Sequence, residues 1–99
     1  MDFDGFDWDK GNRKKCQKHG VSIEVTEGVF TRPVTILPDE AHSKGEQRFR
    51  AIGRTVEGRG VFVVFTLRRR EDDVLLRPIS VRYMHSEEVA TYEKENPDL

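Results

Sequence analysis

The chain has 99 residues, of which 35% are hydrophobic and 35% are charged, with a formal net charge of −1. A chain of this length forms one domain around a modest core, so we expect a single domain over residues 1–99, frayed at 94–99. Cys16 is the only cysteine, which excludes an internal disulfide and favours a reducing, cytoplasmic environment. No signal-peptide pattern opens the chain, and its longest apolar run, 61–65, is too short to span a bilayer.

The charges are unevenly distributed along the chain. Residues 10–82 contain 16 of the 17 basic residues and nine acidic ones, whereas residues 1–9 contain four acidic residues and no basic one. Such segregation allows a basic working surface on a protein without net positive charge. The acidic ends could equally pair with the basic middle and leave no cation for a ligand. Charge alone leaves both interpretations open.

The segment up to residue 20 has the end signals of a first helix. Asp9, or less favourably Asp7, can accept hydrogen bonds from the free N–H groups of the first turn, and Gly20 suits a left-handed stop after the last turn. The side chains expected on the inner face, at helical spacing, are Trp8, Asn12, Cys16 and His19.

Residues 21–30 carry conflicting signals. Val21, Ile23 and Val25 alternate with polar residues, which is typical of a strand. Glu27 and Gly28 are unfavourable for any longer strand.

The following residues favour a sheet. Residues 61–68 are apolar on both faces, which is typical of a central strand, and Pro78 places its strand at an edge or leaves its N–H side unpaired there. We expect a last helix with Ser86 as its N-cap. The expected strands cover 33–37, 47–56, 61–68 and 75–83, with a polar loop at 39–46 and a charged hairpin tip at 69–73.

A strand period of two gathers arginines on one face of this sheet. Arg48 and Arg50 lie opposite Phe49, and Arg82 lies on the face opposite Ile79 and its core-facing neighbours. If the helices cover the apolar face, the arginines line the other one together with Thr66 and Arg68. Guanidinium forks bind phosphate oxygens in pairs. The alternative is the ordinary solvated face of an antiparallel sheet.

Three short motifs, taken in order, resemble the BrnT family of toxins. They are Phe6-Asp7-Trp8-Asp9, Lys18-His19-Gly20-Val21-Ser22 and Arg77-Pro78-Ile79-Ser80-Val81-Arg82-Tyr83. The resemblance spans roughly the whole chain and rests on the order and spacing of the motifs. It implies an α+β, RelE-like fold with a small antiparallel sheet of about four strands and three helices on one side. It also implies a second helix at 21–30 in place of the strand, with Ser22 as its N-cap and Phe30 near its end.

The resemblance further implies the function. Members of the family are ribonuclease toxins of bacterial type II toxin–antitoxin pairs, which arrest translation and growth. We therefore expect an RNA substrate, no cofactor, no membrane contact and a BrnA-type ribbon–helix–helix antitoxin as partner, with DNA contacted only through that antitoxin. The alternative is a non-catalytic relative that binds the antitoxin or RNA without cutting it.

RNA cleavage without a metal needs a base for the 2′-hydroxyl, an acid for the leaving 5′-oxygen and cations around the phosphorane. Glu46 is expected to transfer the proton, and Arg68 and Arg82 to clamp the phosphorane. A plain ion pair is an equally common role for such a carboxylate, and His19 could instead hold free carbonyls at a helix end. The expected RNA-binding residues are Lys18, His19, Arg48 and Arg50.

Two further features point to weaker roles. His42 and Glu46 stand four residues apart, but the loop around them has no other ligand set, so a zinc site is disfavoured. Many members of the family carry Arg and Lys in the last helix, whereas Glu87 and Glu88 make it acidic here. This helix either weakens RNA binding locally or belongs to the antitoxin surface.

Overall fold

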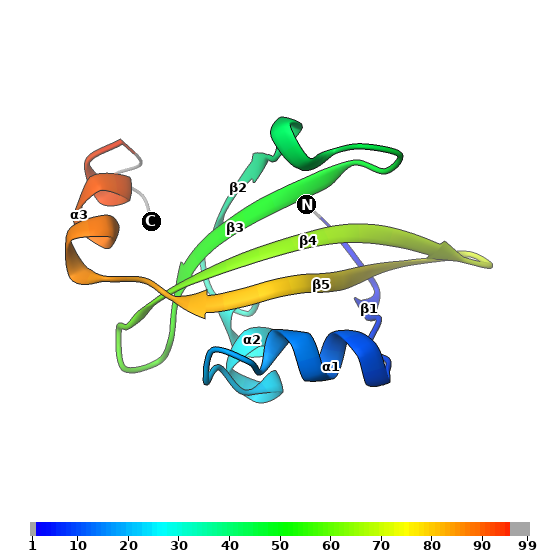
Figure 1. Ribbon diagram of the computed structural model, residues 1–99, viewed down its shortest axis with the longest axis horizontal. Helices are drawn as coiled ribbons and strands as arrows, with labels where there is room; N and C mark the ends of the chain where they lie inside the picture. Colours follow the sequence, from blue (N-terminus) through cyan, green and yellow to red (C-terminus); the bar gives the residue numbers. More distant parts are fainter. Residues whose placement is uncertain (1, 96–99) are drawn as a thin grey trace.

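The computed structural model describes residues 2–95. It has an α+β fold in which a five-stranded sheet, in the order β1-β5-β4-β3-β2, has two helices on one side and a third at one end (Figure 1). None of the described helices is long and apolar enough to cross a membrane. The elements are β1 (Gly5–Phe6), α1 (Lys10–Cys16), α2 (Ile23–Val29), β2 (Thr35–Pro38), the 3-10 helix η1 (Glu40–His42), β3 (Arg48–Arg54), β4 (Gly60–Arg70), β5 (Asp73–Tyr83) and α3 (Ser86–Glu95).

Strand β4 is the centre of the sheet, as predicted. It pairs antiparallel with β3 on one side and β5 on the other. Val61, Val63 and Phe65 are completely buried in the core beneath α1 and α2. Phe62 and Val64 point to the opposite face, so the strand is apolar on both sides.

The sheet differs from the expected one in strand number and length. Gly5 and Phe6 form β1, which pairs parallel with β5, so the sheet has five strands and is mixed. A two-residue strand has no periodicity to recognise. The hairpin tip is also shorter than expected, because β4 continues to Arg70 and pairs there with Asp73.

The helix expected at 21–30 is confirmed. The hydroxyl of Ser22 accepts a hydrogen bond from the N–H of Val25 at 3.1 Å and caps α2. The alternating residues that suggested a strand overlap with a second pattern, since Val21, Val25 and Val29 lie four residues apart. Val21 and Val29 are buried in the core, so the helical period prevails.

Asn12 ties α1 to the edge of β5. Asp9 caps the helix as predicted, because its carboxylate accepts from the N–H of Asn12 at 3.0 Å while the Asn12 side chain accepts from the N–H of Asp9 at 2.7 Å. The Asn12 amide donates to the carbonyls of Asp7 and Pro78, each at 3.0 Å. β1 pairs only with Leu75 and Leu76 of β5, so no strand donates a hydrogen bond to the carbonyl of Pro78. The amide of Asn12 supplies that donor instead.

The inner face of α1 is shorter than predicted. Asn12 and Cys16 are buried, whereas His19 is exposed. The regular helix ends at Cys16, and Gly20 has the expected left-handed conformation with φ 84°. His19 therefore lies in the turn and not on the helical face.

A β-bulge moves Ile79 to the face opposite the core. Val64 pairs with Ser80 and Phe65 with Pro78, so Ile79 is an extra residue between the two pairs. The expected placement of Ile79 on the core face is therefore wrong. A strict period of two cannot reveal where an extra residue resets it.

Helix α3 covers one end of the face that α1 and α2 leave free. Val89 packs on Met84 and Ile52, and a Cβ at Gly60 would overlap the Val89 side chain. The expectation that all helices lie on one side of the sheet is therefore wrong. α1 and α2 occupy one face of the sheet. The residues that follow the end of β5 at Tyr83 lead α3 to the other face.

Glu88 organises the start of α3. Its carboxylate accepts from the N–H of His85 at 3.2 Å and from the guanidinium of Arg82 at 2.9 and 2.7 Å. Ser86 is the first residue of the helix rather than its expected N-cap, because Glu88 reaches back to the residue before it. The helix continues through Glu95, and the remainder of the segment expected to fray, 96–99, lies outside the described residues.

Replacing Asn12 by alanine is expected to lower the free energy of unfolding by roughly 2–4 kcal/mol, because two buried carbonyls lose their donor. Gln17→Ala removes an exposed amide from the same helical segment and is expected to cost less than about 0.5 kcal/mol. Urea unfolding followed by circular dichroism measures both. Equal losses would contradict the role given to Asn12.

The contribution of Glu88 to stability is expected to depend on pH. Hydrogen bonds from Arg82 lower the pKa of Glu88 below 4.5, so its stabilising effect is present above the unfolded pKa and is lost as the pH falls through the folded one. The free energy of unfolding of wild type should exceed that of Glu88→Gln by at most about 1 kcal/mol at neutral pH. The difference should shrink as the pH falls below 4.5 and through the lowered folded pKa of Glu88; a constant difference in urea titrations would refute the assignment.

Candidate functional site

The open face of the sheet is the surface formed by alternate side chains of β3, β4 and β5 that point away from α1 and α2. Beyond the end covered by α3 it contains two adjoining hollows, with volumes of about 510 and 280 Å³. Lys15, Arg48 and Ile79 line both of them. The wide hollow is also lined by Asp39, Ala41, His42, Arg50, Phe62, Val64 and Ser80, and the narrow hollow by Gly11, Asn12, Glu46, Arg68, Arg77 and Pro78.

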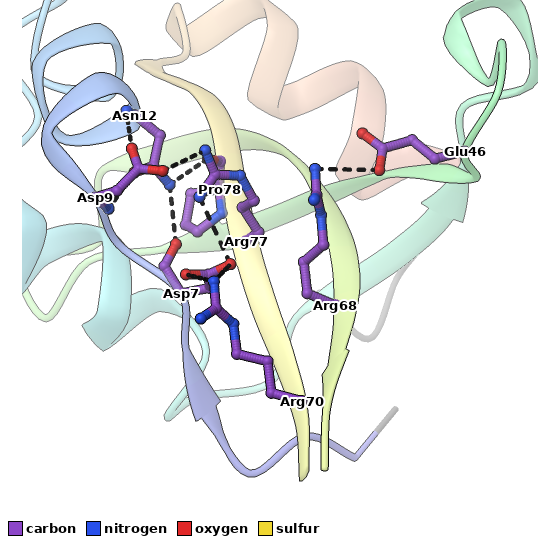
Figure 2. A network of polar contacts seen from close by, with 8 residues as sticks. All are labelled: Asp7, Asp9, Asn12, Glu46, Arg68, Arg70, Arg77 and Pro78. Atoms are coloured by element: carbon purple, nitrogen blue, oxygen red, sulfur yellow. Dashed lines mark hydrogen bonds and ion pairs between the residues drawn. The ribbon is translucent and has the colours of Figure 1, made fainter.

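The narrow hollow brings together an acid and several cations. Arg68 reaches from β4 to the carboxylate of Glu46, with Nη2 and Oε2 3.3 Å apart (Figure 2). Both side chains are about half exposed, at 47% and 36%, so a ligand can reach them. Glu46 precedes β3 and Lys15 comes from α1, so residues of α1, β3, β4 and β5 and of the loop before β3 build this hollow.

Acidic residues of the N-terminal segment bind two of the arginines near this hollow. Figure 2 shows Arg77 between Asp7 and Asp9, at 3.6 and 2.8 Å, and Arg70 on the other side of Asp7 at 3.3 Å. The N–H of Asn12 and then Arg77 lower the pKa of Asp9. The acidic N-terminal segment therefore does form ion pairs with the basic middle of the chain. These pairs involve Arg70 and Arg77.

Arg48 and Arg50 have no carboxylate partner among residues 2–95. Both Nε atoms are buried without a hydrogen-bond partner, which shows that the side chains are packed down onto the sheet. Arg50 makes one long contact, 3.5 Å, to the carbonyl of Pro38. The open face thus holds two positioned guanidinium groups that no acid neutralises.

Arg82 lies far from the other expected catalytic residues. It is opposite Phe62, six residues before Arg68 on β4, a separation of roughly 20 Å along a strand. Its guanidinium makes the two-point ion pair with Glu88 and lies 4.7 Å from the centre of the Phe62 ring. The structure therefore brings Glu46 and Arg68 together but does not bring Arg82 to them.

The expected RNA contacts also divide into two groups. Arg48 and Arg50 line the wide hollow, whereas Lys18 and His19 are exposed after α1 and line neither hollow. Lys18 lines instead a third depression, together with Gly11, Lys14, Lys15 and Gln17, of which Gly11 and Lys15 also line the narrow hollow.

Three residues of the site were missed in the sequence. Lys15 was one of several basic residues on a helix, and Asp39 stood in a polar loop without a periodic pattern. Arg77 was part of a quoted motif but received no role. Only the packing of α1 against the edge of β5 brings Lys15 and Arg77 to the narrow hollow.

Metal ligands and a reactive thiol are not found at this site. Within residues 2–95, no three His, Cys, Asp or Glu side chains are grouped so that they could hold one metal ion. Burial raises the pKa of the Cys16 thiol to about 11, so the thiol stays protonated and unreactive near neutral pH.

The comparison with known families covers this whole region. No curated protein matches the chain. A family model described as "Ribonuclease toxin, BrnT, of type II toxin-antitoxin system" matches residues 8–88, which include every residue of both hollows. Since this match extends over most of the sequence and confirms the resemblance of the motifs, the chain belongs to the BrnT family of ribonuclease toxins of type II toxin–antitoxin systems.

Proposed function

We propose that the narrow hollow is the centre at which this toxin cleaves RNA, by attack of a ribose 2′-hydroxyl on the adjacent phosphorus. The observation that carries the proposal is the ion pair between Glu46 and Arg68 beside Arg48, a guanidinium without a carboxylate partner among the described residues. An acid–base group next to available cations is what this reaction needs.

Each group has a defined task in this mechanism. Glu46 takes the proton of the 2′-hydroxyl, and the oxygen attacks phosphorus while the bond to the 5′-oxygen breaks. Arg48 and Arg68 stabilise the negative charge of the phosphorane. Lys15 gives a proton to the leaving 5′-oxygen. The products are a 2′,3′-cyclic phosphate and a free 5′-hydroxyl, and no metal ion takes part.

The partner we propose is a BrnA-type ribbon–helix–helix antitoxin. The family places the toxin in a type II pair, in which a protein antitoxin neutralises the toxin. The complex would contact DNA only through the antitoxin, and the free toxin would act on RNA in the cytoplasm. The acidic, partly exposed α3 fits a protein partner better than an RNA strand, because phosphates repel its carboxylates.

Substitutions in the narrow hollow are expected to abolish cleavage selectively. Glu46→Gln and Arg48→Gln should each reduce the rate by about 10² or more, because they remove proton transfer and charge stabilisation. Arg69→Gln is the matched control, since Arg69 is exposed and has no ion pair among the described residues. Cleavage of a labelled RNA, with product ends analysed and a chelator present, measures these rates.

Two results would overturn this proposal. Cleavage that the chelator abolishes would refute the metal-independent mechanism. A pure, folded wild type without activity in the presence of ribosomes or naked RNA would favour the non-catalytic binding module.

Arg82→Ala separates the two possible roles of Arg82. We expect the folded variant to cleave RNA within about threefold of wild type, because Arg82 lines neither hollow and its guanidinium is bound by Glu88. Its thermal unfolding should shift downward, because the ion pair with Glu88 is lost. A loss of rate by about 10² in a variant that remains folded would restore Arg82 to the catalytic centre.

A further inference from the structure

The wide hollow has no task in the cleavage step, and its composition differs from that of a phosphate site. Phe62, Val64 and Ile79 give it an apolar surface. Asp39 places a carboxylate among these residues, and its side chain is only 11% exposed. A hollow that combines an apolar surface with one carboxylate and the cations Lys15, Arg48 and Arg50 is well matched to a flat ring whose edges both donate and accept hydrogen bonds.

The backbone of Asp39, which carries this carboxylate, is held in place by hydrogen bonds to its neighbours. The N–H of Asp39 donates to the carbonyl of Arg48 at 2.8 Å. The hydroxyl of Ser43 donates to the carbonyl of Asp39 at 2.7 Å and accepts from the N–H of Arg48 at 2.9 Å. The wall of the hollow is thus attached to the start of β3 by several hydrogen bonds and is preorganised.

This carboxylate keeps unused hydrogen-bonding capacity. Its one polar side-chain contact in the described part of the chain is Nδ1 of His42, at 3.2 and 3.1 Å from its two oxygens. The His42 ring is 70% exposed. Arg48 and Arg50 line the same hollow without forming an ion pair to Asp39. A carboxylate offers about four acceptor positions, so positions remain for a ligand with two neighbouring donors.

We propose that the wide hollow binds a guanine base of the RNA and makes Asp39 the residue that selects it. Guanine alone among the four bases presents a ring N–H and an amino group side by side, a fork that one carboxylate can bind at both oxygens. Its O6 and N7 accept hydrogen bonds from arginine, which Arg50 can supply. Phe62 provides an aromatic surface for the base.

The position of the hollow connects this base to the reaction. Arg48 and Lys15 line both hollows, so a base in the wide hollow belongs to a nucleotide next to the phosphate in the narrow one. The inference rests on the proposed function for its substrate, since it supplies the base specificity of the same site.

The test compares cleavage sites and nucleotide binding in the full chain. Wild type should cut next to guanine, and replacement of that guanine by inosine, which lacks the amino group, should slow cutting there by about tenfold or more. Asp39→Asn should lose the preference for guanine over the other bases by a similar factor. Asp72→Asn, at the exposed hairpin tip, is the matched control and should keep the wild-type pattern.

Binding of guanosine and adenosine monophosphates, measured by calorimetry, distinguishes the two proposals. Tighter binding of the guanosine nucleotide, weakened in Asp39→Asn, supports the guanine site even if wild type cuts no RNA, in which case only the proposed function fails. RNA cleavage with equal rates at guanine, inosine and the other bases would overturn the guanine site and leave the proposed function intact. If Asp39→Asn does not fold, the inosine comparison in wild type decides.

Discussion

The hydrogen bonds of the Asn12 amide are the contacts on which the rest of the structure depends. Pro78 interrupts the edge of β5 because it has no N–H, and its carbonyl lies where no strand pairs with it. Asn12 closes that position from α1, and the bulge beside it turns Ile79 toward the open face. The same contact fixes α1, so it also determines where Lys15 meets the sheet.

The distribution of ion pairs explains how a chain with a net charge of −1 can have a basic surface. Asp7 and Asp9 neutralise Arg70 and Arg77 at one edge. The acids of α3 do the same for arginines at the other end of the sheet. Because strands separate these two regions, the arginines between them remain available. The acidic and basic residues that are separated along the sequence are thus also separated across the sheet. Some arginines pair with the acidic ends of the chain and others form a basic surface, so both interpretations of the charge pattern are partly correct.

Local signals predicted much of the fold, and they failed where long-range geometry intervened. The cap at Asp9 is a short-range hydrogen bond, so its residue indicates it directly, whereas the cap at Ser22 was expected only from the family resemblance. The alternation around Phe49 correctly placed Arg48 and Arg50 on the face away from the core. Arg82 shares that face, but a face says nothing of distance along the strand, and α3 supplies an acid that occupies its guanidinium.

The sequence by itself determined the α+β class, the central strand, the faces of the arginines and, through its motifs, the family. Each of these depends on periodicity or on a short run of residues. Only the tertiary structure decided which arginines are paired, which hollow contains Glu46 and which contains Asp39. Those outcomes depend on residues far apart in the chain, such as Glu46 with Arg68 and Asn12 with Pro78. Register and packing create such contacts, and no local pattern encodes them.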